Sequence, residues 1–151
     1  MRAVIQRVTT PASVEVDREI VGSIDKGLVV LLGIQPGDTQ EDIAWLSKKI
    51  IGLRIFNDDQ EVMNLSLNDI GGNLLVISQF TLHASTKKGN RPSYIKAEKP
   101  DKANIIYRQF IEHVKSIYKL KVEEGRFGAD MKLRLINDGP VTILIDTKIK
   151  E

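Results

Sequence analysis

The first 34 residues alternate short apolar runs with turn-forming residues, a pattern typical of successive β-strands. Residues 2–8, 12–16, 20–23 and 28–32 are the predicted strands, and Val14 and Val16 alternate with polar neighbours as in a half-buried strand. The run 28–32 is wholly apolar, which indicates a buried strand. Turn formers separate the runs: Pro11, Asp17-Arg18 and Asp25-Lys26-Gly27.

Two later segments have the periodicity of amphipathic helices. Asp38 is the predicted N-cap of the first, and Glu41 three residues later completes a capping box. The second helix is predicted to begin at or just after Pro100. We expect both apolar stripes to pack against the core: Ile43, Leu46, Ser47, Ile50 and Leu53 in the first, and Ala103, Ile106, Tyr107, Phe110, Val114 and Ile117 in the second.

Between the helices lie the short segment Arg54-Ile55-Phe56 and a polar turn, and further strands are predicted at residues 73–80, 131–136 and 141–146, the last two joined by a compact turn at 137–140. The total is about eight strands and two helices, with the strands in blocks. This arrangement predicts an α+β fold, with a mostly antiparallel, barrel-like β core against which the two main helices pack. The length of 151 residues fits a single domain, residues 1–151.

Composition narrows the class of protein. No apolar run approaches the ~20 residues that span a bilayer, and the N-terminal residues lack the apolar segment of a secretory signal. The sequence has no cysteine, so we expect no disulfide framework and a cytoplasmic protein. The net charge of +2 does not by itself indicate nucleic-acid binding.

The basic residues are nevertheless unevenly distributed. Residues 83–99 contain one acid, Glu98, and five bases: Lys87, Lys88, Arg91, Lys96 and Lys99. Such a stretch can hold a phosphate backbone. Charge alone favours an ordinary solvated loop.

Several common sites are missing from the sequence. It has no phosphate-binding Walker loop, no Gly-rich dinucleotide turn, no G-x-S-x-G and no H-E-x-x-H. With two histidines and no cysteine, we expect no metal site and no cofactor. His113 is expected on the surface of the second helix, which leaves His83 as the candidate imidazole base.

Two segments remain as candidates for chemistry. Residues 78–82 place hydroxyls and an amide at the end of an apolar strand, where they either turn outward or line a cleft. Residues 137–142 read as a hairpin turn, since Asp-Gly is a strong hairpin dipeptide, although Pro140 removes a ladder hydrogen bond. A trans bond before Pro140 is the expectation from physics alone, whereas a cis bond would make a tight backbone tip.

Together these two segments, Ser78-Gln79-Phe80-Thr81-Leu82 and Asn137-Asp138-Gly139-Pro140-Val141-Thr142, resemble the pair of motifs that defines the D-aminoacyl-tRNA deacylase family. The resemblance runs over nearly the whole chain. It includes Ile5-Gln6-Arg7-Val8, Met63-Asn64-Leu65, Lys88-Gly89-Asn90-Arg91-Pro92-Ser93 and Gly125-Arg126-Phe127-Gly128-Ala129-Asp130-Met131. Tyr94 departs from the Phe expected in the family, which puts the local packing there in doubt.

The resemblance implies an enzyme that hydrolyses the ester of D-aminoacyl-tRNA and rejects L-aminoacyl-tRNA. It implies a homodimer in which a Gly–cis-Pro tip of one subunit enters the active site of the other, and it replaces the expectation of a trans bond. It also implies the roles of individual residues. The pocket for the terminal adenosine and aminoacyl group would be lined by Ser78, Gln79, Phe80 and Thr81 and walled by Phe127 and Met131, with Gly139 and Pro140 as the chiral selector and Arg7 as its brace.

Given such a substrate, acceptor-stem phosphates become the expected ligands of Lys87, Lys88 and Arg91, with no membrane or DNA partner. A steric wall at Cα would let glycine pass, so activity on Gly-tRNA is expected. Water or Thr81 would attack the ester. Two rival hypotheses stay open: an RNA-binding module without chemistry, and a small-molecule esterase that uses Thr81 and His83.

Overall fold

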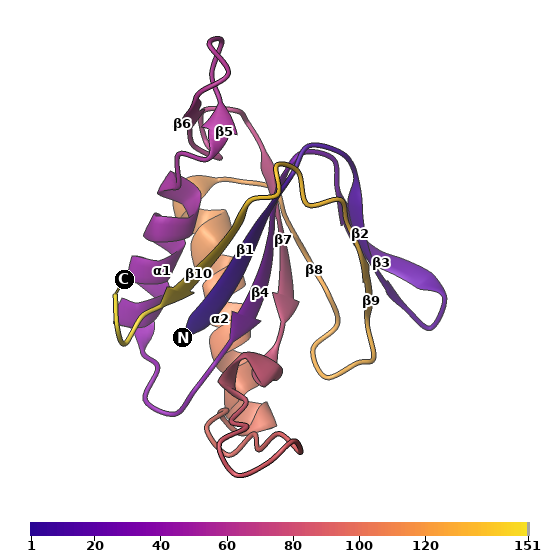
Figure 1. The fold of residues 1–151 in the computed structure, drawn as a ribbon, viewed down its shortest axis with the longest axis vertical. Coiled ribbons are helices and arrows are strands. Elements are labelled where there is room, and N and C mark those ends of the chain that lie inside the picture. Colours follow the sequence, from indigo (N-terminus) through magenta and orange to yellow (C-terminus); the bar gives the residue numbers. More distant parts are fainter. Residues whose placement is uncertain (151) are drawn as a thin grey trace.

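The computed structural model describes residues 1–150 as ten strands, two α-helices and one 3₁₀ helix (Figure 1). The α+β class predicted from the sequence is confirmed. The elements are β1 (Arg2–Val8), β2 (Ala12–Val16), β3 (Glu19–Ile24), β4 (Gly27–Gly33), α1 (Gln40–Gly52), β5 (Phe56–Asn57), β6 (Met63–Leu65), β7 (Asn73–Ser78), η1 (Phe80–His83), α2 (Pro100–Tyr118), β8 (Val122–Glu124), β9 (Lys132–Arg134) and β10 (Thr142–Asp146).

The main sheet has the order β10-β1-β4-β7-β8. β1 pairs antiparallel with β10 and β4, whereas β4–β7 and β7–β8 are parallel pairs. A second antiparallel sheet has the order β3-β2-β9, and β5 pairs with β6. Most pairs are antiparallel as predicted, but the sheets do not close into a barrel within residues 1–150.

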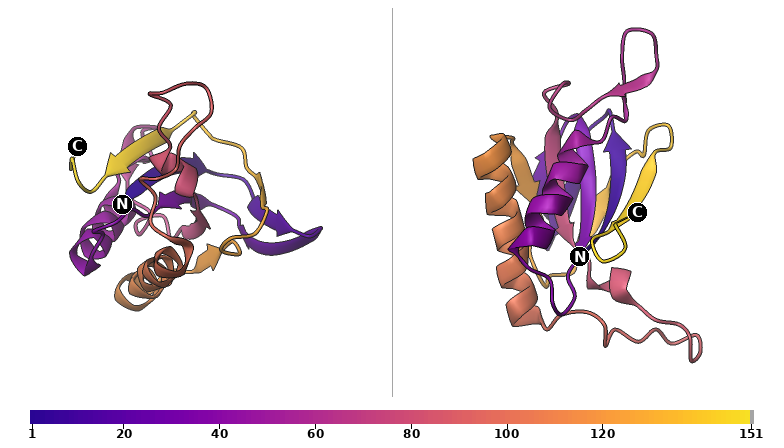
Figure 2. Two further views of the ribbon diagram at one scale, coloured as in Figure 1. Left: turned by 90° about the horizontal axis from the view of Figure 1, so that it is seen from below. Right: turned by 90° about the vertical axis from the view of Figure 1, so that its left-hand side faces the viewer.

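Side-chain alternation divides the core into two layers. Leu74 and Val76 of β7 face α1 and α2, which lie together on one side of the main sheet (Figure 2). Leu75 and Ile77 face the other way, into a smaller core with β2 and β3. Because β4 and β7 are covered on both faces, their sequences are continuous apolar runs rather than alternating ones.

The predicted N-cap of α1 is wrong by one residue. Thr39 is the N-cap, and Asp42 rather than Glu41 completes the capping box. Asp38 is instead buried, and its carboxylate accepts a hydrogen bond of 2.6 Å from the Met1 ammonium group. The second helix begins at Pro100 as predicted. Neither α-helix in residues 1–150 combines the length and apolar character that a membrane span requires.

The expected hairpin at residues 137–140 is also wrong. β9 pairs with β2 and β10 pairs with β1, so the turn joins strands of two different sheets. The strand predicted at 73–80 ends at Ser78, where the chain turns into η1. β5, β6 and β8 were not predicted because two or three residues carry no periodicity.

The ion pair of Met1 with Asp38 is fully buried, since both side-chain groups have 0% exposure. Removal of one partner of a buried pair leaves the other charge uncompensated. We expect Asp38→Asn to lower the free energy of unfolding by about 3 kcal/mol, measured by urea denaturation. Asp25→Asn, at an exposed turn, is the control, and equal stability of the two variants would contradict the prediction.

Candidate active site

The candidate site begins where β7 ends. Gln79 donates its backbone N–H to the Leu32 carbonyl at 2.8 Å, so the chain still follows β4 one residue beyond the strand. A Cβ on Gly33 would lie 2.9 Å from the Gln79 carbonyl oxygen, so glycine permits this close approach. The chain then turns into η1, and Phe80 is left 56% exposed.

Thr81 and His83 are not paired. The Gln79 side-chain amide donates a hydrogen bond to the Thr81 hydroxyl. His83 is only 1% exposed and lies against Gly33, and its Nε2 has no hydrogen-bond partner among the described residues. Burial lowers the pKa of His83, and the positive charges of Arg2 and Met1 lower it further. A base that is buried and directed elsewhere does not activate the Thr81 hydroxyl.

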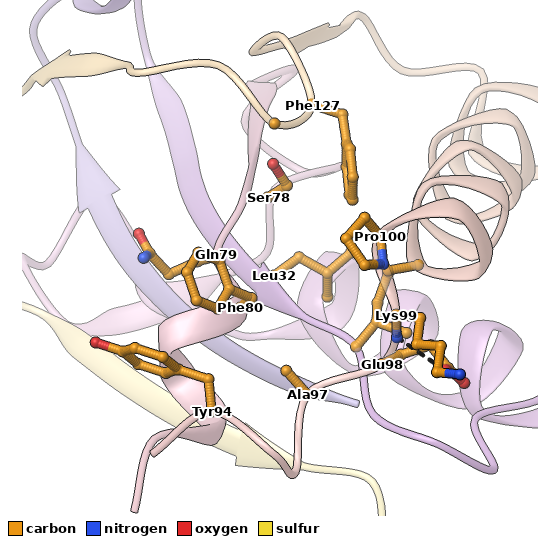
Figure 3. A pocket seen from close by; sticks show the side chains of 13 residues that line it. Leu32, Ser78, Gln79, Phe80, Tyr94, Ala97, Glu98, Lys99, Pro100 and Phe127 are labelled. Carbon is orange, nitrogen blue, oxygen red and sulfur yellow. Dashed lines mark hydrogen bonds between the residues drawn. The ribbon is translucent and has the colours of Figure 1, made fainter. Parts of the chain in front are cut away.

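A cavity of about 400 Å³ opens beside the end of β7 (Figure 3). Ser78, Gln79 and Phe80 form one side, and Phe127 approaches Pro100 from the opposite loop. The remaining wall comes from β4 and from the segment leading into α2: Leu32, Ile34, Tyr94, Ala97, Glu98, Lys99 and Ala103. A mainly apolar hollow with a few polar groups is the usual form of a small-ligand site.

Phe80 and Tyr94 stand at the mouth of this cavity, with ring centroids 5.0 Å apart in an edge-to-face arrangement. The unexpected tyrosine at 94 is therefore accommodated in an aromatic pair.

Met131 lies on the other side of the strand end. There a second hollow of about 240 Å³ shares Ser78, Gln79 and Phe80 with the first and is closed by Met131 and other residues of the 128–133 segment. The structure thus places Phe127 and Met131 on opposite sides of residues 78–80.

The loop that carries Gly139 and Pro140 is exposed at its apex, and its Gly–Pro bond is cis. Arg7 holds this loop from below. Its Nε donates to the Asp138 carbonyl at 3.2 Å and its Nη1 to the Ile55 carbonyl at 2.6 Å, while backbone bonds join Arg7 to Asp138 and to Val141. These contacts hold Arg7 against the loop that it is predicted to brace.

Within one chain the apex does not reach the cavity. Arg7 pairs with Leu28, which pairs with Leu74 at the start of β7, whereas the cavity lies beyond Ser78. Four residues of strand correspond to about 13 Å. Figure 1 shows the apex and η1 at opposite ends of the main sheet.

Lys87, Lys88 and Arg91 lie in the exposed loop between η1 and α2, which a bridge between Ser85 and Ser93 narrows. No ion pair of these three side chains occurs within residues 1–150. In that same part of the chain no cluster of three or more acidic or histidine side chains is placed to hold a metal ion.

The sequence does not predict the wall formed by residues 97–100. Pro100 marked the start of a helix, but no local signal showed that this start would lie against the end of β7.

The family model described as D-Tyr-tRNA(Tyr) deacylase matches residues 4–146, which span both walls of the cavity and the Arg7-braced loop. The chain belongs to this family. It is 60% identical to a D-aminoacyl-tRNA deacylase of Flavobacterium psychrophilum and 58% identical to one of Parabacteroides distasonis, each over 151 residues and the whole length of both chains.

Two solved structures are similar to this member of the family. One, titled c-Myc DNA Unwinding Element Binding Protein, is 39% identical with a TM-score of 0.89, and the match covers 97% of this chain and 98% of that one. The other, titled as a probable eukaryotic D-amino acid tRNA deacylase, has a TM-score of 0.79 over 95% and 98% of the two chains. At 16% identity the second shows the fold alone.

The lowered pKa of His83 predicts how stability changes with pH. Above its ordinary pKa of 6.5 the ring is neutral in both states. Below that value the unfolded chain takes up a proton that the folded chain does not, so the free energy of unfolding decreases as the pH is lowered. We expect urea denaturation to show a lower stability at pH 5.5 than at pH 7.5, and His83→Gln to reduce this difference.

His113→Gln, which removes the other imidazole, is the matched control. An unchanged pH dependence in His83→Gln would contradict the prediction.

Proposed function

We propose that this protein hydrolyses the ester bond of D-aminoacyl-tRNA and releases the D-amino acid and free tRNA. The observation that carries the proposal is the cavity at the end of β7, which Ser78, Gln79 and Phe80 line. The family model covers almost the whole chain around it. We take residues 1–151 as one catalytic domain that acts in the cytoplasm, where aminoacyl-tRNA is used. The terminal adenosine and the aminoacyl group would occupy the hollows on either side of this segment.

The proposed enzyme is a homodimer whose active sites lie at the subunit interface. Gly139 and Pro140 of one subunit would reach the end of β7 in the other, beside the aminoacyl group, because the apex cannot reach the end of β7 in its own chain. An apolar row across the sheet supports a second copy: Leu144 pairs with Val4, and Val4 with Leu31, on the face opposite the helices. Leu144 is 63% exposed, as is suitable for a surface that a partner covers.

The apex would select the D-enantiomer by exclusion. D- and L-residues carry the same side chain, and pocket contacts that differ by a methylene give only ~1–3 kcal/mol. A discrimination of ~10⁴ corresponds to about 5.5 kcal/mol, which requires a clash rather than a weaker attraction. Backbone atoms at Gly139 and Pro140, held by the guanidinium of Arg7, would stand where an L side chain must go. Glycine has no side chain to meet them.

Catalysis would rest on positioning and on backbone donors. The first hydrogen-bonded N–H of η1 belongs to Leu82, so the turn leaves the N–H groups of Phe80 and Thr81 for the developing oxyanion. One such donor contributes ~10²–10³ in rate. The Thr81 hydroxyl accepts a hydrogen bond from Gln79 and has no imidazole beside it. Water, aided by the neighbouring ribose hydroxyl, is therefore the proposed nucleophile.

These contacts disfavour the two rival hypotheses. An esterase that uses Thr81 and His83 requires their contact, and His83 is buried against Gly33. An RNA-binding module without chemistry leaves the braced apex and the apolar cavity without a role. The exposed Lys87, Lys88 and Arg91 would hold acceptor-stem phosphates of any tRNA.

Incubation with charged tRNA tests the function. We expect rapid release of tyrosine from D-Tyr-tRNA, release of glycine from Gly-tRNA, and no release from L-Tyr-tRNA above the spontaneous rate. Acid-precipitable label over time is the measurement. Equal release from both tyrosyl enantiomers would refute the steric wall, and release from none would refute the enzyme.

Thr81→Ala tests the nucleophile. If water attacks, the variant keeps deacylation of D-Tyr-tRNA within about tenfold of the unchanged protein, because only a positioning contact with Gln79 is lost. Single-turnover kinetics measure the rate. A complete loss of deacylation with normal tRNA binding, or a trapped acyl-enzyme, would identify Thr81 as the nucleophile instead.

A further inference from the structure

A third hollow, of about 270 Å³, lies on the far side of Phe127 from the main cavity. α2 forms one side of it, and the chain leaving β8 forms the other. Its lining includes two arginines and a glutamate: Val21, Asn104, Tyr107, Arg108, Glu124, Gly125, Arg126 and Phe127.

The wall between the two hollows is firmly held. Tyr107 is 2% exposed, and its hydroxyl donates to the Val76 carbonyl at 2.8 Å. The Phe127 ring packs on the Tyr107 ring with centroids 5.7 Å apart. Phe127 thereby lines both hollows, with Tyr107 fixing its position.

The floor is equally closed. A Cβ on Gly22 would lie 2.6 Å from the Glu124 carbonyl oxygen, so β3 packs directly against the backbone of β8. This contact brings Val21 beneath the hollow.

The charged groups at this hollow are only loosely paired. Arg108 is 3.9 Å from Glu124, and Arg126 is 3.8 Å from Asp17, with the two arginine side chains 67% and 57% exposed. Exposed pairs of this kind contribute little to stability. Both guanidinium groups and the Glu124 carboxylate therefore remain able to bind a ligand that offers an anion and a hydrogen-bond donor.

We propose that this hollow binds the cytidine that precedes the terminal adenosine of tRNA. The inference rests on the proposed function and assigns the adenosine to the main cavity, so that the aminoacyl group would occupy the hollow beside Met131. The next nucleotide must then lie within one phosphodiester of the adenosine, and the hollow beyond Phe127 adjoins the main cavity. Since every mature tRNA ends in the same CCA sequence, a cytidine subsite serves all substrates alike.

Each group has a chemical partner in cytidine. Arg108 and Arg126 bind the phosphate, the usual ligand of guanidinium groups at such interfaces. Glu124 accepts a hydrogen bond from the N4 amino group of cytosine, which uracil replaces with an acceptor oxygen. Phe127 offers an aromatic surface on which bases stack.

Binding of non-hydrolysable amide analogues tests the subsite. The probes are 3′-(D-tyrosyl)amino-3′-deoxyadenosine and the same compound extended at its 5′ side to CpA or UpA, titrated by calorimetry. We expect the CpA analogue to bind about tenfold more tightly than the adenosine analogue and several-fold more tightly than the UpA analogue.

Variants assign the residues. Arg108→Gln with Arg126→Gln should remove most of the advantage of CpA and leave the adenosine analogue within about twofold. Glu124→Gln should equalise CpA and UpA, because an amide can donate to the uracil oxygen. Lys115→Gln with Lys121→Gln removes the same charge outside the hollow and should change neither ratio.

Equal affinity for the adenosine and CpA analogues in the unchanged protein would overturn the subsite and leave the proposed function standing. A CpA advantage that both arginine changes leave intact would overturn the assignment as well. If no analogue bound and D-Tyr-tRNA was not hydrolysed, the proposed function would fall together with the subsite.

Discussion

The site depends on the parallel pairing of β4 with β7. These two strands are buried on both faces, so side-chain packing fixes their register from above and below. The pairing carries Gln79 past the end of β7 alongside Leu32 and forces the chain to turn where Gly33 leaves room. A slip of one residue would exchange the side chains of β7 between its two covered faces and disrupt the packing on both. The exposed Phe80 thus stands on some of the most buried strands of the molecule.

The same sheet separates two functional ends. β1 runs antiparallel to β4, so the end of β1 that carries Arg7 lies away from the cavity. The Arg7 guanidinium donates hydrogen bonds to the backbone carbonyls of Asp138 and Ile55. A loop tied by its main chain presents a shape that does not vary with side-chain rotamers. That property suits a group that must exclude one enantiomer whatever amino acid is attached. The antiparallel pairing of β1 with β4 is also the reason that, in the proposed dimer, the apex of one chain would serve the cavity of the other.

Local sequence patterns predicted most of the helices and strands. Where the structure differs from the prediction, a long-range contact is the cause. The strands 2–8, 12–16 and 28–32 and both helices follow from periodicity. The cap of α1 was misplaced because Asp38, a good N-cap by type, is taken by the ammonium group of Met1, 37 residues away. The predicted hairpin at 137–140 is wrong because the flanking strands do not pair with each other: β9 pairs with β2, and β10 pairs with β1. The candidate site residues in the two family motifs were predicted by resemblance, whereas neither the resemblance nor the periodicity indicated the wall at 97–100.

The segment from Gly125 to Met131 links the three hollows, and its glycines explain how. A Cβ on Gly125 would lie 2.5 Å from the Met131 sulfur, so the chain folds back closely on itself and directs Phe127 and Met131 to opposite sides. Phe127 then lines the first and third hollows and Met131 the second. A substrate whose parts are an amino acid, an adenosine and a further nucleotide needs three adjoining places of different polarity. One short loop, packed on Tyr107 at one side and on β7 at the other, contributes part of the wall of each of the three hollows.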